Sequence, residues 1–245
     1  MLYSTELTYY KDAYQKSSHT EIIRVDKHLD NKLDVYLDAT IFYPYGGGQP
    51  SDQGMIITES GKAEVKNVQM VSGVVRHEAV LIEGDIDTGQ EADLEIDWER
   101  RHWDMRVHTA GHVIHDVLTG LVNGLTPVRG DHGSKPYLEY TPEIDASIDR
   151  EKLKEQLQLA VNKVITEDRN VDTRETSLNE LQSIARHIPP NLPKDKPLRM
   201  IRIEGFYAMP DGGTQVKKLK EIGKVEIKSI NCNQGKTTIK YSVTD

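Results

Sequence analysis

The chain has 245 residues, of which 37% are hydrophobic and 29% charged, and its formal net charge at pH 7 is −8. That length allows one large or two ordinary globular domains. It carries no apolar run long enough to span a membrane and no apolar leader segment, so we expect a cytoplasmic protein without a membrane partner. The single cysteine, Cys232, excludes internal disulfides and cysteine-rich zinc modules.

The charge is distributed unevenly along the chain. Residues 191–245 hold 11 Lys and Arg against six Asp and Glu, a net charge of +5, which leaves −13 for residues 1–190. A basic carboxyl end can be a solvated face, or it can bind a phosphate backbone. Composition alone leaves both interpretations open.

The first hundred residues alternate between apolar and polar side chains, as β-strands do. Strands at residues 18–25 and 32–37 are expected to pair across the turn at 28–31. Further strands are expected at residues 54–59, 62–71, 74–79 and 91–96. Short strands separated by Gly, Ser or Asp turn signals predict a small β-barrel domain over residues 1–100.

Three consecutive glycines, Gly46, Gly47 and Gly48, interrupt this pattern. Glycine weakens a strand and frees the backbone, so the segment is not the interior of a strand. It is either a wide hairpin turn or a loop whose amides face a ligand or a neighbouring domain.

Near residues 98–104 the apolar period changes from two to that of a helix, which predicts a second domain over residues 101–245. In the helix that follows, His108 and His112 are four residues apart and so lie on one face, where two imidazoles can hold one metal ion. Thr109 stands where the metalloprotease motif has glutamate, so a water-activating group must come from elsewhere. Equally, such a pair can be structural, because the spacing is common in helices.

The remaining elements predict an antiparallel sheet with packed helices, and hence an α+β fold. The histidine helix should end at Asn123-Gly124. A strand pair is expected around Val128 and residues 137–140, joined by a turn at 130–134. The other expected elements are a helix capped by Ser147 or Asp149, a helix at 177–187, a proline-rich loop at 189–197, and strands at 198–204, 223–231 and 236–243.

Three motifs in order resemble the free-standing alanyl-tRNA editing proteins of the AlaX family, of medium length. They are the glycine-rich run from Thr40 to Gln49, His108-Thr-Ala-Gly-His112, and the second signature from Met209 to Val216 followed by Glu221-Ile-Gly223. The resemblance covers essentially the whole chain. It implies hydrolysis of the ester that joins a wrong amino acid, serine or glycine, to alanine tRNA, with an RNA rather than a DNA partner.

The resemblance also implies a zinc site. In that family the two helix histidines and a Cys-x-x-x-His pair bind the ion, and here Asp211 and Gln215 stand at the pair's positions. Carboxylate oxygen is a normal zinc ligand, whereas an amide is a weaker one. His108, His112, Asp211 and Gln215 are therefore the predicted metal-binding residues. The alternative is that Asp211-Gly-Gly is a turn in a degenerated site.

Substrate and RNA contacts are predicted by position. The candidates for binding the amino acid are Thr40, Gly46, Gly47, Gly48, Gln49, Asp131, His132 and Ser134. The candidates for acceptor-stem phosphates are Lys217, Lys218, Lys220 and Lys224, just beyond the second signature. His115 is the candidate base, although a histidine on a helix flank can also be structural. Two other functions stay open: a metal-free module that binds aminoacyl-tRNA, and a metal-dependent hydrolase of a small ester or amide.

Overall fold

The computed structural model describes residues 4–189, 192 and 198–245. The chain forms two compact units. The first holds the chain up to Gly46 and Pro50–Trp103, and the second holds Gly47–Gln49 and Asp104–Asp245. The two units divide between residues 103 and 104, three residues after the predicted domain boundary. The assignment of the two domains stays a prediction. Helix α1 (Trp98–Leu121) contributes residues to both units.

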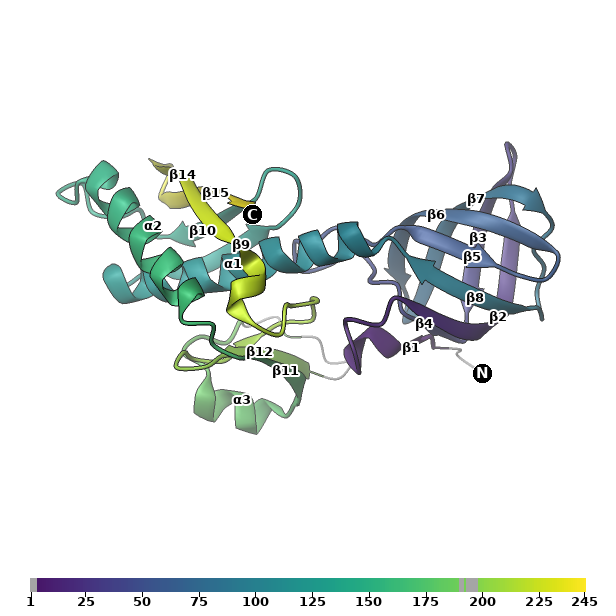
Figure 1. The fold of residues 1–245 in the computed structure, drawn as a ribbon. Coiled ribbons are helices and arrows are strands. Elements are labelled where there is room, and N and C mark those ends of the chain that lie inside the picture. Colours follow the sequence, from purple (N-terminus) through teal and green to yellow (C-terminus); the bar gives the residue numbers. More distant parts are fainter. Residues whose placement is uncertain (1–3, 190–191, 193–197) are drawn as a thin grey trace. The chain divides into compact units, whose positions relative to one another are not determined.

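The first unit contains a closed antiparallel barrel, which confirms the barrel predicted from the period-two pattern (Figure 1). In β8, the residues 92, 94 and 96 are buried while 91, 93 and 95 are exposed, so one face of the strand forms the core. The strands follow each other around the barrel as β2 (Ser17–Lys27), β3 (Lys32–Leu37), β7 (Val74–Gly84), β6 (Gly61–Val71), β5 (Gly54–Ile57) and β8 (Glu91–Ile96).

The first unit also contains short elements that the side-chain pattern of the sequence does not predict. A parallel pair joins β1 (Glu6–Leu7) to β4 (Ala39–Thr40), and a 3-10 turn, η1, covers Thr8–Tyr10. Strands of two residues contain a single period of side-chain alternation, so no repeat is there to be recognised in the sequence.

Buried charges of the first unit hold the beginning of α1. The helix starts at Trp98, and Asp97 accepts a hydrogen bond from the Arg100 amide at 3.1 Å, as a capping residue does. Arg101 is fully buried and pairs with Asp52, and its guanidinium also donates to the Ile41 carbonyl at 2.6 Å. Because a buried charge without partners would cost several kcal/mol, ~3–5 by analogy with other buried pairs, this network explains how an arginine is tolerated in the core.

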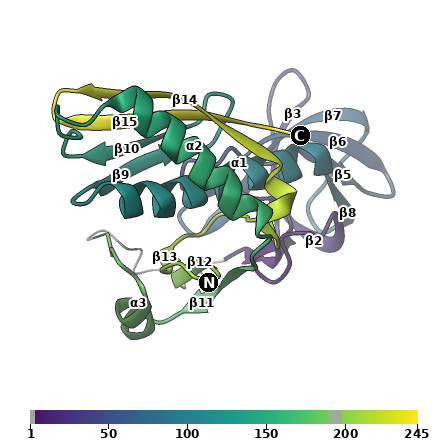
Figure 2. The same cartoon turned by 60° about the vertical axis from the view of Figure 1, so that its left-hand side comes forward.

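The second unit is built on an antiparallel sheet in the order β14 (Lys224–Asn233), β15 (Lys236–Thr244), β10 (Tyr137–Thr141) and β9 (Thr126–Asp131). Helices α1 and α2 (Arg150–Thr166) lie alongside it in both ribbon views (Figures 1 and 2). The Asn162 side chain of α2 bonds both the amide and the carbonyl of Val225 on β14. Asp149, one of the two predicted caps, caps α2, and the observed sheet and helices confirm the α+β fold.

A smaller three-stranded sheet in the second unit was only partly predicted. It contains β11 (Val171–Thr176), β12 (Leu198–Ile203) and β13 (Met209–Pro210), of which the sequence predicts only β12. β11 has no buried residue, so it lacks the apolar alternation that reveals a strand. A 3-10 turn, η2 (Leu219–Ile222), precedes β14.

The predicted ends of two helices need correction. α1 ends at Leu121, before the expected Asn123-Gly124. α3 (Leu178–Ile184) begins within one residue of its predicted start, after its cap Ser177, but ends before His187 because Ala185 is extended and forms a bridge with Ala208. Of the proline-rich loop expected at residues 189–197, only 189 and 192 lie among the described residues.

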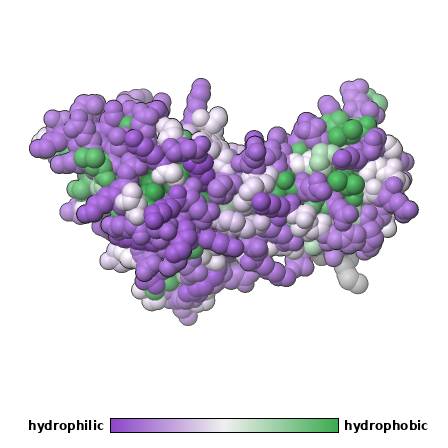
Figure 3. All heavy atoms as spheres, in the orientation of Figure 1, coloured by the Kyte–Doolittle hydropathy of each residue, from purple (hydrophilic) through white to green (hydrophobic). Residues whose placement is uncertain are grey.

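No helix in the described part of the chain is long and apolar enough to cross a membrane. Figure 3 shows mainly hydrophilic side chains on the visible face, with separate apolar patches between them.

Candidate metal centre

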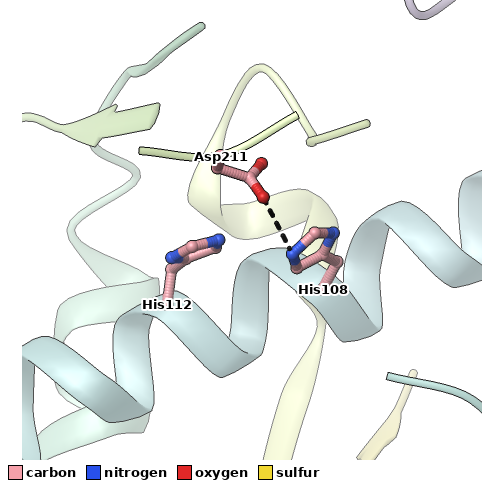
Figure 4. Close-up of side chains that lie close together, drawn as sticks. All are labelled: His108, His112 and Asp211. Carbon is pink, nitrogen blue, oxygen red and sulfur yellow. Dashed lines mark ion pairs between the residues drawn. The ribbon is translucent and has the colours of Figure 1, made fainter. Parts of the chain in front are cut away.

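Three side chains from two distant segments meet in the second unit. α1 presents His108 and His112 one turn apart, and Asp211 faces them from the loop after β13 (Figure 4). Each of the three offers a ligand atom, and these atoms lie within 4.8 Å of one another. The Nε2 atom of His108 is 3.5 Å from Asp211 Oδ1. The structure therefore brings together the two histidines and the carboxylate among the residues predicted to bind a metal, and the fourth, Gln215, bonds Asp211.

A glycine lets the Asp211 loop approach α1 closely. A Cβ atom on Gly213 would lie 2.3 Å from His108 Cε1 and 2.9 Å from Gln49 Oε1. The Gly213 amide also donates to Asp211 Oδ2 at 3.1 Å, which turns the loop back on itself. The Asp-Gly-Gly sequence is thus a turn, as one interpretation held, and at the same time it delivers a carboxylate to the histidines.

Gln49 determines which nitrogen of His108 carries the proton. Its Oε1 accepts the Thr214 backbone amide at 3.0 Å, and its Nε2 donates to the Thr214 hydroxyl at 2.7 Å, so the orientation of the amide is defined. The same Oε1 lies 2.9 Å from His108 Nδ1, which must therefore donate. In the neutral ring the lone pair then belongs to Nε2, the atom that faces Asp211.

His112 supplies the observation that tests the site for a metal. Its Nε2 is buried and has no hydrogen-bond partner among the described residues, an uncommon state for a buried polar atom. Burial lowers the pKa of His112, with Asp211 opposing the shift, and lowers the pKa of His108 further still. Neutral imidazoles and a carboxylate are the forms that bind zinc, so this donor set fits the ion.

Gln215 uses its amide for neighbouring side chains. The nitrogen Nε2 donates to Asp211 Oδ2 at 2.8 Å, and the oxygen Oε1 accepts the Thr109 hydroxyl at 2.7 Å. Its role as a ligand, suggested by position in the motif, stays a prediction.

His132 packs against the same histidines. Its ring stacks on His108 with a centroid distance of 4.2 Å, and a Cβ on Gly111 would lie 2.6 Å from it. Its Nδ1 is 2.8 Å from Tyr241 Oη, which donates its single proton to the Val107 carbonyl at 3.1 Å. When Tyr241 donates to Val107, His132 donates from Nδ1 and its Nε2 is an acceptor.

A pocket of about 580 Å³ opens onto these side chains, a volume typical of small-molecule sites. Three further residues with titratable side chains line the pocket: His115, Tyr140 and His187. Burial, assisted by His112, lowers the pKa of His115 to about 4, so this ring is neutral at pH 7. The lining comprises Gly47, Gly48, His108, Gly111, His112, His115, Pro127, Val128, Arg129, Gly130, His132, Leu138, Glu139, Tyr140, His187, Pro189, Met209, Pro210 and Asp211.

The predicted substrate-binding residues divide into two groups. Gly47, Gly48 and His132 line the pocket, and Gln49 contacts His108. The other four do not line the pocket: Thr40 is buried in the first unit with its hydroxyl bonded to His77, Gly46 accepts from Tyr43, Asp131 accepts from the Gly133 amide, and Ser134 is exposed. Their proposed roles gain no support from their positions.

The four predicted RNA-binding lysines, Lys217, Lys218, Lys220 and Lys224, are all exposed. Sequence reasoning missed Thr214, Tyr140, His187 and Tyr241 as parts of this neighbourhood. Thr214 lies within the second signature, whereas no local pattern marks Tyr140, His187 and Tyr241, because each reaches the centre only through tertiary packing.

Comparison with known proteins supports the resemblance seen in the motifs. Residues 3–100 match the family model described as tRNA synthetases class II (A). The chain is 34% identical to the alanyl-tRNA editing protein AlaX-M of Methanosarcina acetivorans and 33% identical to that of Methanosarcina barkeri, over 95% of this chain and 96% of each relative.

Longer relatives match over part of their length. Identity to the alanyl-tRNA editing protein AlaX-L of Pyrococcus horikoshii is 32% over 91% of this chain but 54% of that protein, so the chain spans about half of it. Identity to the alanine–tRNA ligase of Methanopyrus kandleri is 33% over 91% of this chain and 24% of the ligase. Because the AlaX-M relatives match along nearly their whole length, the chain belongs to the AlaX family of alanyl-tRNA editing proteins.

Proposed function

We propose that this chain deacylates mischarged alanine tRNA in trans, hydrolysing the ester between a wrong amino acid and the terminal adenosine. Serine is the first substrate to test and glycine the second. The observation that carries this proposal is the convergence of His108, His112 and Asp211 at a pocket in a chain of the AlaX family.

The need for such a reaction follows from the limits of binding selectivity. A synthetase pocket shaped for alanine rejects serine or glycine weakly, because one hydroxyl or one methyl is worth only ~1–3 kcal/mol. A second site that hydrolyses the wrong product must therefore bind serine through its hydroxyl, the group that alanine lacks. A buried acceptor satisfied only by that hydroxyl would be left unpaired by alanine, at a cost of ~1–3 kcal/mol.

His132 is the pocket residue best suited to this demand. Its Nδ1 is committed to Tyr241, which leaves Nε2 as an acceptor for a hydroxyl donor. Because the ring stacks on His108, a hydroxyl bound there would lie beside the candidate metal centre.

Zinc is the cofactor we assign to His108, His112 and Asp211, and when bound it polarises a carbonyl as a Lewis acid. The two histidines are kept neutral by burial, so their nitrogens are available as donors. Asp211 supplies the negative charge of the donor set. Lys217, Lys218, Lys220 and Lys224 are proposed to contact phosphates of the acceptor stem, where exposed ammonium groups attract RNA.

Single-turnover deacylation tests the reaction. The protein should release serine from alanine tRNA much faster than it releases alanine, and a chelator should slow that release. His112→Ala should abolish most of the activity, whereas the matched change His19→Ala, at an exposed position of the barrel, should leave it intact. Equal rates for serine and alanine, or no deacylation by the zinc-loaded protein, would refute the proposal.

The RNA contact has its own test. Replacing Lys217 and Lys218 together by alanine should weaken tRNA binding and reduce its salt dependence by about one to two charges, with the chemical step nearly unchanged. Replacing Lys32 and Lys66, exposed lysines of the barrel, provides the control. A protein that binds tRNA but hydrolyses nothing would be a binding module, and one that cleaves small esters without binding tRNA would be a different hydrolase.

A further inference from the structure

Gln215 lies next to the candidate metal centre, yet its amide points at protein groups. Asp211 Oδ2 accepts from Gln215 Nε2 at 2.8 Å, and Gln215 Oε1 accepts from Thr109 Oγ1 at 2.7 Å. The residue is only 4% exposed, so water does not offer an easy alternative to these bonds.

Chemistry fixes the orientation of that amide. An ionised carboxylate only accepts hydrogen bonds, so the amide group nearest Asp211 has to be the NH₂ group. Oε1 consequently faces Thr109, whose oxygen in turn accepts the Val216 backbone amide at 3.1 Å. For Oε1 to bind a metal, Gln215 would have to rotate; Asp211 would then lose a donor, and the Thr109 hydroxyl would keep only the Met105 carbonyl, 2.9 Å away, as an acceptor.

The two oxygens of Asp211 have different surroundings. Oδ2 is held by two N–H donors, Gln215 Nε2 and the Gly213 amide, at 2.8 and 3.1 Å. Oδ1 lies 3.5 Å from His108 Nε2. A carboxylate anchored through one oxygen presents the other in a defined direction, as an outer partner of a metal ligand does.

We propose that Gln215 is a positioning residue that orients Asp211 and is not itself a ligand, so that this chain holds its metal with three protein ligands, His108, His112 and Asp211. Three protein ligands leave a coordination position for substrate or water, whereas four close the site. The inference rests on the metal-dependent function proposed above, but it concerns metal binding by the free protein.

A double-mutant cycle separates the two roles of Gln215. The dissociation constants of zinc and cobalt are measured by competition with a chromophoric chelator for the parent protein, Gln215→Ala, Asp211→Ala and the double variant. Gln215→Ala should weaken binding by ~10–100-fold in the parent, as loss of an outer partner does. In the Asp211→Ala background, Gln215→Ala should change the dissociation constant by less than about twofold. A residue that acts only by orienting the Asp211 carboxylate has no effect once that carboxylate is removed. Equal losses in both backgrounds would show that Gln215 is a ligand and overturn the inference.

Thr109→Val decides the question independently if Asp211→Ala binds metal too weakly to measure. A positioning residue that loses its anchor at Oε1 holds Asp211 less firmly, so metal binding should weaken several-fold. If Gln215 were instead a ligand, loss of its bond to Thr109 would leave metal binding unchanged or tighter. That result would overturn the inference. Thr119→Val is the matched control, since Thr119 bonds the His115 carbonyl on the same helix and has no bond to Gln215.

A spectroscopic measurement tests the remaining coordination position. The visible absorption of the cobalt-loaded protein should shift when azide is added, because an anion can occupy the fourth position. An unchanged spectrum at saturating azide would point to a closed four-ligand site and overturn the inference. None of these measurements uses tRNA, so a protein that passes them and fails to deacylate would refute only the proposed function.

Discussion

Replacing Gln49 by alanine should weaken metal binding at the candidate centre, although Gln49 is not one of its predicted ligands. The side chain accepts from His108 Nδ1 at 2.9 Å and from the Thr214 amide at 3.0 Å, and it is fully buried. Without it the His108 ring is free to rotate and to move its proton to Nε2, the atom required for the metal. Changes to such outer partners weaken metal binding by ~10–100-fold, or ~1.4–2.7 kcal/mol.

The same change should also destabilise the fold. Two buried N–H donors, on His108 and Thr214, lose their acceptor, and each unsatisfied donor costs ~1–3 kcal/mol. Gln158→Ala is the control for this general cost, because Gln158 accepts the Ile227 amide at 2.9 Å and has no bond to a candidate ligand. It should lower the free energy of unfolding and leave metal affinity unchanged.

Chelator competition measures the affinity, and nitrogen-15 NMR of the histidine rings reports the tautomer of His108. Gln49→Glu keeps the acceptor for both donors, so it should preserve the tautomer and bind metal at least as tightly as the parent protein. If Gln49→Ala left both the zinc affinity and the His108 tautomer unchanged, the reasoning from Gln49 to the metal centre would be wrong.

Three further predictions concern packing and pH. Gly213→Ala should lower metal affinity at least tenfold because its Cβ would lie 2.3 Å from His108 Cε1, whereas Gly120→Ala, which meets nothing within 4 Å, should not. Burial lowers the pKa of His77 in the barrel to about 4, below its unfolded value, so acidification from pH 7 to 4 should cost ~3 kcal/mol of unfolding free energy, and His77→Gln should remove that slope in urea titrations. Burial raises the pKa of Asp116 from 3.8 to about 7, so this group has the opposite sign: its contribution is present below pH 4, and up to ~4 kcal/mol is lost as pH rises from about 4 to 7, which offsets the His77 change in the parent protein and which Asp116→Asn should abolish. A parent-like slope in either variant would contradict the assignment.

Local patterns in the sequence were sufficient for much of the architecture. Strands β3 and β8 match their predicted bounds because alternation of buried and exposed side chains is a property of each strand by itself. The cap of α2 was narrowed to Ser147 or Asp149, because a capping bond joins residues two or three positions apart, and Asp149 is the residue that caps it. The histidine pair was visible for the same reason, since the helical repeat alone places His108 and His112 on one face.

Tertiary structure decided how the polar side chains around that pair are used. Gln49 and Gln215 are amides with both donors and acceptors, and the sequence does not say which partner each finds. Gln49 bonds Thr214, which is 165 residues away, and Gln215 bonds Thr109, which is 106 residues away. Such pairings depend on how distant segments pack, so no local period encodes them. The sequence by itself determined a helix with two candidate ligands and a loop with a carboxylate, and packing determined that the Gln49 amide bonds the histidine while the Gln215 amide bonds the aspartate.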